Sequence, residues 1–495
     1  MTARALAELT PDLASAPADV WVSDVTLDSR AVTPGSLFLA CRGIAHHGVQ
    51  FAQQAAERGA RAVLFETGAG VQAPQLPPQV FVAAVPRLSA RASEIAGRFF
   101  GSPSQTMTVA GITGTNGKTT SAWLLAQALT LCGRPAAYAG TLGFGLPGAL
   151  QPASHTTADA VSVQRQLDTL RRLGATCVGM EVSSHALHQG RVAAVRFHTA
   201  VFTNLTRDHL DYHGTLQAYA DSKALLLAWP QLKVRVINVD DPLGAQLAAR
   251  AAPSRLLVTS RQAQRGEFVR AAAVGLRPNG LDIDVESSFG NARLCVPLAG
   301  DFNVDNALTV LAVLLGLDVP LAEAVQALSQ SRAPSGRMEI FGGAGTLPLV
   351  IVDYAHTPDA LAKALAAARR HCRGRLSVVF GCGGDRDAGK RPLMGAIAAE
   401  LADDITLTDD NPRTEDPARI VADIRAGIPS GRAVHIEHDR ARAIQNAVAG
   451  AAASDAVLVA GKGHEDYQIH GHERRAFADQ AVVREQLKVQ ACSAR

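Results

Sequence analysis

The chain of 495 residues is 47% hydrophobic and 19% charged, which excludes extensive disorder and predicts about two to four packed domains. Its 48 Lys and Arg residues nearly balance its 45 Asp and Glu residues. The resulting net charge of +3 is too small to indicate a nucleic acid or a membrane surface as a partner, and we expect neither.

Two features of the sequence bear on the cellular compartment: the lack of a recognisable targeting segment and the spacing of the cysteines. No stretch approaches the ~20 apolar residues of a membrane-spanning helix, and residues 1–21 lack the apolar core of a signal peptide. The cysteines are scattered and form no C-x-x-C pair, so neither a disulfide framework nor a cysteine zinc site is indicated. We therefore expect a protein of the reducing cytoplasm.

The first predicted domain spans residues 1–104. Strands are predicted at 23–32 and 36–41, and a helical segment follows at 49–60. A further helix lies within 85–105 and runs into a Gly-Ser-Pro-Ser break, where we place the boundary.

The second predicted domain, residues 105–333, alternates apolar strands with helices. Such strands are typical of a parallel sheet covered on both faces, and they are predicted at 106–113, 176–184, 196–205 and 234–241. Residues 268–300 have the pattern of antiparallel hairpins inserted beside that sheet. The expected fold class is therefore α/β.

The third predicted domain, residues 334–495, resumes the alternation and is expected to be Rossmann-like. Each apolar strand is followed by a polar cluster, and the segments are 349–358, 376–387, 404–413, 433–439 and 456–466. Because ligands of open α/β sheets bind at the carboxyl ends of the strands, this domain is predicted to hold a substrate.

A phosphate loop lies in "VAGITGTNGKTTSAWLLAQAL", residues 109–129. Backbone N–H groups from Gly114 to Thr119 can surround an anion, and the helix that begins near Lys118 points its positive end at it. Lys118 suits the β- and γ-phosphates and the Thr119 hydroxyl suits Mg²⁺. One glycine departs from the usual pattern, because Ile112 stands where that pattern has Gly.

The second domain contains further polar residues whose roles the sequence pattern alone does not decide. Glu181 ends a predicted strand and could hold Mg²⁺, although a solvated strand end is equally compatible with its position. Ser184 and His185 lack the G-x-S-x-G context of a hydrolase, and His209 with His213 lacks the glutamate of the zincin pattern. By pattern alone, Lys223 is a solvated lysine on an amphipathic helix.

In the third domain, charged residues favour an anionic substrate with an ammonium group. Arg386 and Arg413 each follow a predicted strand and could pair with carboxylates, although each taken singly could be a solvated charge. Gly461 permits close approach of the backbone, and Glu465 could bind an ammonium group.

Long, ordered motifs in all three domains resemble the Mur ligases. They are "VTLDSRAVTPGSLFLACRG", "GITGTNGKTT", "MEVSSHAL", "TNLTRDHLDYHG", "GDFNVDNALTV", "SGRME", "DYAHTPDAL", "GCGGDRDAGKRPLMG", "TDDNPRTEDP" and "GKGHEDYQ". The resemblance is strongest to members that add meso-diaminopimelate to UDP-N-acetylmuramoyl-L-Ala-D-Glu. It implies ATP-driven amide formation, in which a substrate carboxylate becomes an acyl phosphate that the incoming amine attacks.

The resemblance assigns an ATP and Mg²⁺ site. The ATP-binding positions would be Gly114, Thr115, Asn116, Gly117, Lys118, Thr119, Thr120, Asn303, Asn306, Arg337 and Asp353. The Mg²⁺ ligands would be Thr119, Glu181, His209 and Lys223, the last as a carbamate formed with CO₂. Lys118, Glu181, His209 and Lys223 would form the catalytic set.

The resemblance also assigns the two other substrates. The UDP-muramoyl dipeptide would contact Leu27, Ser29, Ile44, Ala45, His46, His155, Thr156, Thr157, Ser183, Gln189 and Arg191. His155 departs from a close relative, which has Asn there, and this puts one contact in doubt. Meso-diaminopimelate would contact Arg386, Asp410, Asn411, Pro412, Arg413, Gly461 and Glu465.

Several alternatives stay open from sequence. A lysine-adding Mur ligase is disfavoured by Arg413, which would lose its partner if lysine bound. A folate polyglutamate synthetase is disfavoured by the long N-terminal block. A P-loop switch or motor protein would hydrolyse ATP without an amino acid, and a nicotinamide-dependent enzyme lacks a complete G-x-G-x-x-G. We expect a monomer whose third domain closes when ligands bind.

Overall fold

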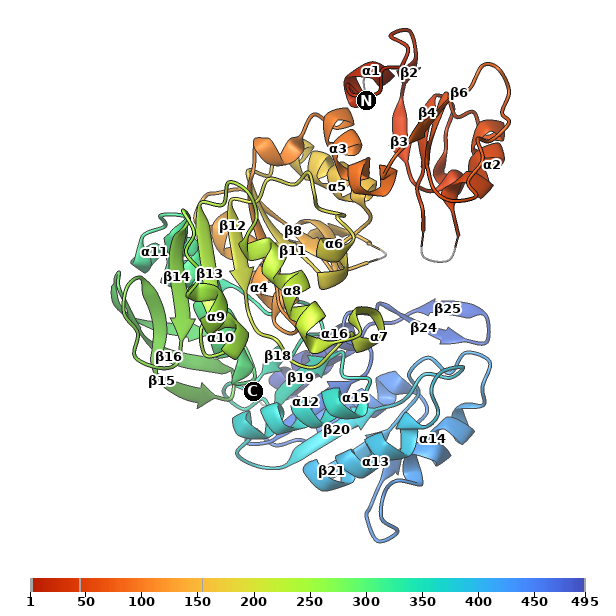
Figure 1. The fold of residues 1–495 in the computed structure, drawn as a ribbon. Coiled ribbons are helices and arrows are strands. Elements are labelled where there is room, and N and C mark those ends of the chain that lie inside the picture. The colour runs from red at the N-terminus through yellow and green to blue at the C-terminus, as the bar shows by residue number, and fades with distance from the viewer. Residues whose placement is uncertain (1–2, 44–45, 154, 494–495) are drawn as a thin grey trace. The chain divides into compact units, whose positions relative to one another are not determined.

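The structure, a computed structural model, describes residues 3–43, 46–153 and 155–493 (Figure 1). The described residues form two compact units, residues 1–258 and 259–495. This division falls inside the second predicted domain, so the boundaries near residues 104 and 333 stay predictions. In the part of the chain that is described, no helix is long and apolar enough to cross a membrane.

The N-terminal sheet of the first unit is parallel, in the order β3-β4-β5-β6. Its strands are β3 (Asp24–Thr26), β4 (Ser36–Ala40), β5 (Ala62–Glu66) and β6 (Phe81–Val85). Around it lie β1 (Arg4–Ala5), α1 (Leu6–Leu9), β2 (Trp21–Val22), α2 (Ala52–Glu57) and α3 (Leu88–Phe99), with short 3₁₀ turns at Ser29–Ala31 and Gly48–Phe51.

Both faces of that sheet are buried. Leu37 and Leu39 of β4 pack into one apolar cluster with α3, whereas Phe38 and Ala40 pack into another with α2. This alternation is the period-two pattern of a strand that is covered on both sides. The strand predicted at 23–32 is shorter than expected because Ser29–Ala31 turns into a 3₁₀ helix that Asp28 caps.

The central sheet of the first unit has the order β10-β9-β8-β11-β7-β12-β13-β14. Its strands are β7 (Thr108–Thr113), β8 (Ala136–Gly140), β9 (Gly143–Leu146), β10 (Ala149–Gln151), β11 (Cys177–Glu181), β12 (Thr199–Phe202), β13 (Val234–Asn238) and β14 (Arg255–Ser260). The five neighbouring strands β8, β11, β7, β12 and β13 are parallel, as predicted. Strands β9 and β10 add an antiparallel edge beside β8.

Helices cover this sheet. They are α4 (Lys118–Leu131), α5 (Ala160–Arg172), α6 (Ser184–His188), α7 (Leu210–His213), α8 (Leu216–Leu227) and α9 (Pro242–Ala248), with a 3₁₀ turn at Pro103–Gln105. Four of them, α5, α6, α8 and α9, begin at a capping side chain. Asp159 caps α5 and Thr215 caps α8 by accepting hydrogen bonds from the first backbone N–H groups.

The second unit begins with the predicted antiparallel hairpins. These are β15 (Phe268–Arg277), β16 (Gly280–Ser287) and β17 (Gly290–Val296), and α10 (Phe302–Gly316) and α11 (Leu321–Gln330) follow. Helix α10 is buried along most of its length.

The rest of the second unit is a mostly parallel sheet in the order β18-β19-β23-β20-β21-β22. Its strands are β18 (Glu339–Gly342), β19 (Leu349–Asp353), β20 (Leu376–Phe380), β21 (Asp404–Leu407), β22 (His435–Ile436) and β23 (Ala456–Ala460), and β24 (Tyr467–His470) pairs with β25 (Glu473–Ala476).

Helices cover both faces of this sheet. The helices are α12 (Pro358–His371), α13 (Lys390–Leu401), α14 (Pro417–Arg425), α15 (Arg440–Ala449) and α16 (Asp479–Ser493). Helices α12, α13 and α14 pack on one face, and α15 and α16 pack on the other. Because β19, β23, β20 and β21 are adjacent and parallel, their polar C-terminal loops lie at one edge, as predicted.

Candidate active site

The phosphate loop joins β7 to α4, and its glycines are required by geometry. Gly117 has φ +85°, and a Cβ on Gly114 would lie 1.9 Å from the Thr203 hydroxyl oxygen. Gly111, the displaced glycine, serves packing, because a Cβ there would lie 2.8 Å from the Phe197 ring. The Lys118 ammonium donates to the carbonyl oxygens of Gly114 at 2.8 Å and Thr115 at 3.0 Å, inside the loop.

The segment after β12 holds this loop in shape. The Thr115 N–H donates to the Asn204 carbonyl at 2.8 Å, and the Asn116 N–H donates to the Asn204 side-chain oxygen at 2.9 Å. The Thr203 hydroxyl donates to the Asn116 carbonyl at 2.6 Å. Helix α4 begins at Lys118, directly after this loop, and the first N–H groups of a helix have no partner within the helix, which is the arrangement of a phosphate site.

Glu181 is fully buried at the end of β11, so it is not a solvated strand end. Its carboxylate accepts hydrogen bonds from the Thr119 hydroxyl at 2.9 Å, from the Thr141 N–H at 2.9 Å and from the Tyr138 hydroxyl. Parallel pairing of β11 with β7 sets Glu181 opposite Ile112 and so beside the loop. A hydroxyl and a carboxylate in contact form an oxygen donor set that fits Mg²⁺.

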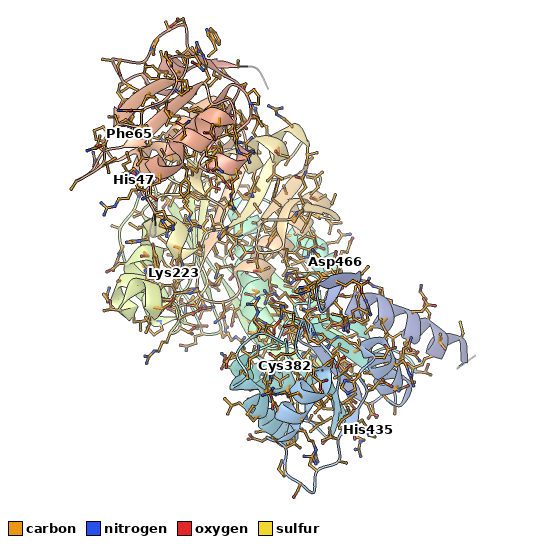
Figure 2. All side chains as sticks on the ribbon, turned by 90° about the vertical axis from the view of Figure 1, so that its right-hand side faces the viewer. His47, Phe65, Lys223, Cys382, His435 and Asp466 are labelled. Carbon is orange, nitrogen blue, oxygen red and sulfur yellow. The ribbon has the colours of Figure 1, made fainter. Side chains whose placement is uncertain are left out.

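Lys223 is also buried and is not the solvated lysine that its pattern indicates (Figure 2). Its Nζ donates to the Gly114 carbonyl at 2.7 Å and lies 4.4 Å from the centre of the Tyr219 ring. Burial, and then the nearby charge of Lys118, lower the pKa of Lys223 to about 6. At neutral pH this side chain is therefore largely an uncharged amine.

His209 starts α7 in the left-handed conformation, with φ +53°. Its ring packs against His185 and Tyr219, and its Nε2 lies 3.6 Å from Asp208. Among the described residues it makes no hydrogen bond to Glu181. The same part of the chain contains no group of three or more His, Cys, Asp or Glu side chains placed to hold a metal.

Several of the residues assigned to the UDP-muramoyl dipeptide come together around Thr157. The Thr157 hydroxyl donates to the Glu181 carbonyl at 2.9 Å and accepts from the Ser183 N–H at 3.0 Å. Arg191 donates to the Thr157 carbonyl at 2.9 Å and to Gln189 at 2.8 Å. The Thr156 and Thr141 hydroxyls are 3.0 Å apart, whereas the His155 side chain is exposed.

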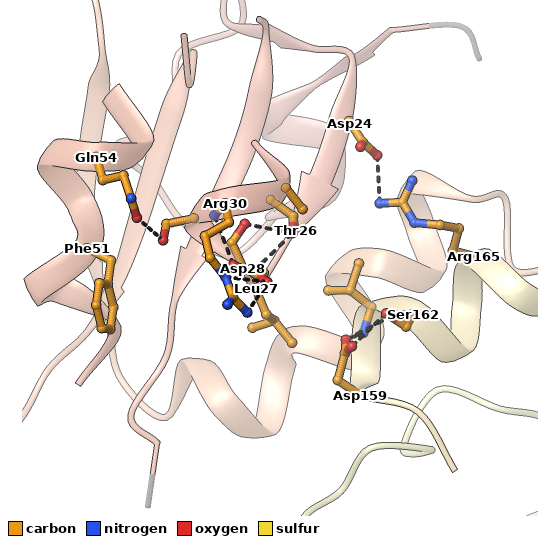
Figure 3. A pocket seen from close by; sticks show the side chains of 13 residues that line it. Asp24, Thr26, Leu27, Asp28, Arg30, Phe51, Gln54, Asp159, Ser162 and Arg165 are labelled. Carbon is orange, nitrogen blue, oxygen red and sulfur yellow. Dashed lines mark hydrogen bonds and ion pairs between the residues drawn. The ribbon is translucent and has the colours of Figure 1, made fainter. Parts of the chain in front are cut away.

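A cavity of about 1140 Å³ in the first unit contains Leu27 and Ser29 (Figure 3). Its other lining residues include Phe51, Gln54, Asp159 and Arg165. The Ser29 hydroxyl donates to the Gln54 side-chain oxygen at 2.6 Å, which leaves the Gln54 amide nitrogen to donate elsewhere. His46 is exposed and its ring lies 6.3 Å from that of Phe51; Ile44 and Ala45 lie outside the described residues.

The remaining nucleotide residues lie in the second unit. Asn303 donates to the Ala299 carbonyl at 2.7 Å and accepts from Asn306 at 2.7 Å, so both amides are oriented on α10. Asp353 accepts from the Met338 N–H at 2.8 Å, and burial raises the pKa of its carboxyl. The Arg337 guanidinium stacks 5.1 Å from the Tyr354 ring centre.

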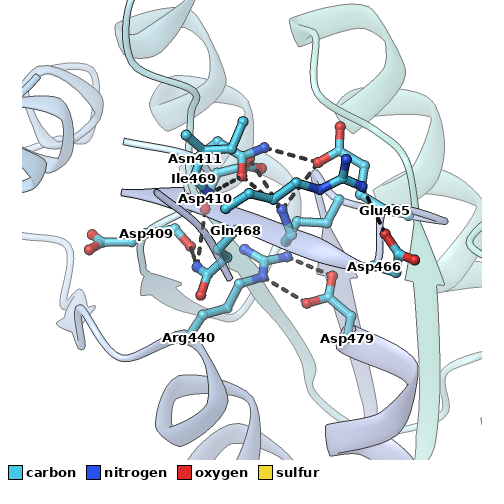
Figure 4. Close-up of polar contacts among 12 residues, drawn as sticks. Asp409, Asp410, Asn411, Arg440, Glu465, Asp466, Gln468, Ile469 and Asp479 are labelled. Carbon is cyan, nitrogen blue, oxygen red and sulfur yellow. Dashed lines mark hydrogen bonds and ion pairs between the residues drawn. The ribbon is translucent and has the colours of Figure 1, made fainter. Parts of the chain in front are cut away.

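Three of the residues assigned to diaminopimelate, Asp410, Asn411 and Glu465, lie close together at the carboxyl edge of the second unit's sheet (Figure 4). Asn411 donates to Glu465 at 2.9 Å, and a Cβ on Gly461 would lie 2.6 Å from an Asp410 oxygen. Arg413 has φ +50° and donates to the Gly384 carbonyl at 2.8 Å. A Cβ on Gly383 would lie 3.0 Å from a guanidinium nitrogen of Arg413 and 3.7 Å from Cγ of Arg386. Both arginine side chains therefore pass close to Gly383.

Pro412 shapes the same loop contact. A Cβ on Gly384 would lie 1.9 Å from the Pro412 carbonyl oxygen, so the loops after β20 and β21 touch through backbone atoms. Because Pro412 directly precedes Arg413, this contact fixes the backbone from which the Arg413 side chain extends.

Sequence reasoning missed several residues of the site. Tyr138, Thr141 and Tyr219 support Glu181 and Lys223, and Tyr354 supports Arg337. Lys462, between two glycines after β23, is completely buried, which is rare for a lysine. In the sequence, only its place beside Glu465 in "GKGHED" marks it.

Comparisons with known proteins agree with the Mur ligase motifs of the sequence. Three protein-family models match this chain. They are the Mur ligase family catalytic domain over residues 22–98, the Mur ligase middle domain over 112–314 and the Mur ligase glutamate ligase domain over 336–463. A UDP-N-acetylmuramoyl-L-alanyl-D-glutamate–2,6-diaminopimelate ligase of Ectopseudomonas mendocina (strain ymp) is 49% identical, covering 96% of this chain and 97% of its own. The enzyme of the same name from Xanthomonas campestris pv. campestris (strain 8004) is also 49% identical, covering 98% and 97%.

Solved structures give the same result. A structure of a ligase of that name has a TM-score of 0.74 and 36% identity, covering 99% of this chain and 100% of its own. A MurF from Acinetobacter baumannii has a TM-score of 0.61 at 19% identity, covering 99% of each chain, and shares the fold.

Proposed function

This chain belongs to the Mur ligase family, and we propose that it joins meso-diaminopimelate to the D-Glu γ-carboxylate of UDP-N-acetylmuramoyl-L-Ala-D-Glu. Its membership makes it an ATP-dependent ligase with the predicted α/β fold. The amino-acid substrate comes from the names of the 49% identical relatives and from the residues that surround Arg413.

The phosphate loop and its neighbours would bring the two anionic reactants together. A carboxylate is a poor electrophile at neutral pH, and transfer of the γ-phosphoryl group supplies a leaving group. Lys118 and the N–H groups at the start of α4 would hold the triphosphate. Asn303 and Asn306 would border the adenine, and Arg337 and Asp353 would contact phosphates and ribose.

Thr119 and Glu181, with His209, would hold Mg²⁺. When bound, the ion offsets the charge between the carboxylate and the triphosphate. Lys223 is proposed to join this set as a carbamate, because only an uncharged amine reacts with CO₂, and the carbamate oxygens are anionic. Its burial, its contact with the loop and its lowered pKa of about 6 support this proposal.

The cavity bordered by Leu27 and Ser29 is proposed to bind the uracil end of the substrate. It offers the exposed ring of Phe51 for stacking and the Gln54 amide for hydrogen bonding. Thr157, Ser183 and Arg191, which are joined by hydrogen bonds, would contact the muramoyl dipeptide.

The main structural support for meso-diaminopimelate as the amino-acid substrate is that Arg386 and Arg413 both lie close to Gly383. Meso-diaminopimelate differs from lysine by one distal carboxylate, which Arg413 can bind through two hydrogen bonds. If lysine bound instead, the guanidinium would lose that partner. We therefore propose the diaminopimelate-adding activity over the lysine-adding one.

The ligase reaction is tested by measuring phosphate release. We expect release only when ATP, the UDP-muramoyl dipeptide and meso-diaminopimelate are all present. Equal release without the amino acid would instead indicate a P-loop switch or motor protein. We also propose that the chain acts as a monomer in the cytoplasm, where ATP is abundant.

A further inference from the structure

Lys462 is a buried cation that touches the predicted amino-acid pocket. Its side chain is 0% exposed, and its ammonium donates to Glu465 Oε2 at 3.1 Å and to Asn411 Oδ1 at 3.2 Å. Asp410 Oδ1 lies 4.0 Å away. A cation this deeply buried is retained only with close partners, and all three partners belong to the proposed pocket.

Lys462 fixes which way the Asn411 amide faces. Asn411 Oδ1 accepts from both Lys462 and the Ile469 N–H, the latter at 3.0 Å. With the oxygen held by two donors, the amide nitrogen must face Glu465, to which it donates at 2.9 Å. The orientation of Asn411 therefore depends on the ammonium of Lys462.

One oxygen of Glu465 is held and the other is presented. Oε2 accepts from both Lys462 and Asn411, whereas Oε1 accepts no hydrogen bond from the residues that the structure describes. The Glu465 side chain is 18% exposed, so Oε1 can be reached by a ligand. A carboxylate fixed through one oxygen is preorganised to accept from an ammonium group through the other.

A second buried ion pair lies beside this cluster (Figure 4). Arg440 and Asp479 neutralise each other through two hydrogen bonds, of 2.7 Å and 2.8 Å. Burial raises the pKa of the Asp410 carboxyl, which favours its uncharged form. Glu465 is therefore the carboxylate of this cluster that is placed to bind an amino-acid ammonium group.

We propose that Lys462 is a positioning residue for the amino-acid substrate, because it holds Glu465 and Asn411 in the orientation that presents Glu465 Oε1 to the substrate ammonium group. This inference rests on the proposed function, since the pocket is that of the incoming amino acid. Lys462 itself touches no substrate and acts through Glu465.

A Lys462→Met variant tests this role in the full-length enzyme. We expect the KM for meso-diaminopimelate to rise about tenfold or more while kcat changes by less than about threefold, because the lost interaction concerns binding. The KM for ATP should be unchanged. The matched control is Lys488→Met, which removes an exposed lysine on α16 and should leave every constant unchanged.

A double-mutant cycle separates positioning from general stabilisation. In a Glu465→Gln background, Lys462→Met should raise the KM by less than about threefold, because the carboxylate through which Lys462 acts is already absent. A Lys462→Arg variant, which keeps the charge, should restore part of the binding.

Equal effects of Lys462→Met in both backgrounds, or an unchanged KM, would overturn the inference. If Lys462→Met does not fold, Lys462→Gln, which keeps a donor without the charge, carries the same prediction. The wild-type enzyme gives the separate test of the proposed function: if it makes no product with meso-diaminopimelate, the function is wrong, whereas a wild-type product with no change in the variant contradicts only the role of Lys462.

Discussion

Nζ of Lys223 donates a hydrogen bond to the carbonyl oxygen of Gly114 at 2.7 Å, which ties α8 to the phosphate loop across 109 positions of sequence. Burial of this lysine lowers its pKa to about 6. An exposed lysine keeps a pKa of about 10.4 and is almost fully protonated at neutral pH. The fold therefore supplies a reactive amine beside the site where phosphoryl transfer is proposed.

Replacement of Lys223 by Ala should abolish turnover, because neither the amine nor its carbamate can form. Phosphate release with all three substrates is the measurement. Wild-type activity should also fall when CO₂ and bicarbonate are removed and return when bicarbonate is added. Lys233→Ala, which removes an exposed lysine of the same unit, is the control. Full activity of Lys223→Ala would rule out the carbamate.

Lys118→Ala should impair the use of ATP. We expect kcat/KM for ATP to fall by about 10²–10³-fold, the range found when one preorganised donor to developing charge is lost. Initial rates at varied ATP concentration measure this effect. A change confined to the KM for the amino acid would place Lys118 elsewhere in the reaction.

Glu181→Gln should weaken the proposed Mg²⁺ site while preserving the size of the side chain. We expect the Mg²⁺ concentration that gives half the maximal rate to rise about tenfold or more, because one anionic oxygen ligand is lost. Titration of Mg²⁺ in the phosphate assay measures the shift. Glu94→Gln, on the exposed side of α3, provides the matched control, and an unchanged Mg²⁺ requirement for Glu181→Gln would contradict this role.

His371 makes the second unit sensitive to acid. Its Nε2 accepts from the Gly300 N–H at 2.9 Å, so Nδ1 carries the proton and donates to the Arg277 carbonyl at 2.6 Å. Burial lowers the pKa of His371 below its ordinary value of 6.5. The unfolded chain therefore binds the proton first, and the contribution of His371 to stability is complete above pH 6.5 and is lost as the pH falls below that value.

His371→Gln keeps a donor and an acceptor but cannot titrate. The thermal midpoint of the wild-type protein should fall more between pH 7 and pH 5 than that of the variant. His435→Gln, at an exposed position of the same unit, is the control. Parallel midpoints for wild type and His371→Gln over this range would show that His371 does not contribute.

Much of the fold could be predicted because apolar strands and helices alternate plainly. The strands at 106–113, 176–184, 196–205 and 234–241 correspond to β7, β11, β12 and β13, and the hairpins at 268–300 correspond to β15–β17. The strand at Ala136–Gly140 was not predicted, since its small residues carry little β signal. The turn at Ser29 was missed because it depends on the local cap by Asp28.

The parts of the site that could be predicted are those whose residues lie close together in the sequence. The phosphate loop follows from its glycines, Lys118 and Thr119. Lys223 and Lys462 show the limit of such reasoning, because both resemble solvated lysines and are buried only through contacts with distant segments. Family resemblance supplied Lys223 but not Lys462, and only the packing of the second unit identified the latter.

The most direct test of the account compares meso-diaminopimelate with lysine in wild-type enzyme and in Arg413→Ala, by phosphate release in the presence of ATP and the UDP-muramoyl dipeptide. We expect wild type to prefer meso-diaminopimelate in kcat/KM by about 10²-fold or more, since bound lysine would leave the partly buried Arg413 guanidinium without a carboxylate partner. Arg413→Ala should lose most of that preference. Equal kcat/KM for the two amino acids with wild-type enzyme would contradict the assignment of Arg413 and the proposed substrate with it.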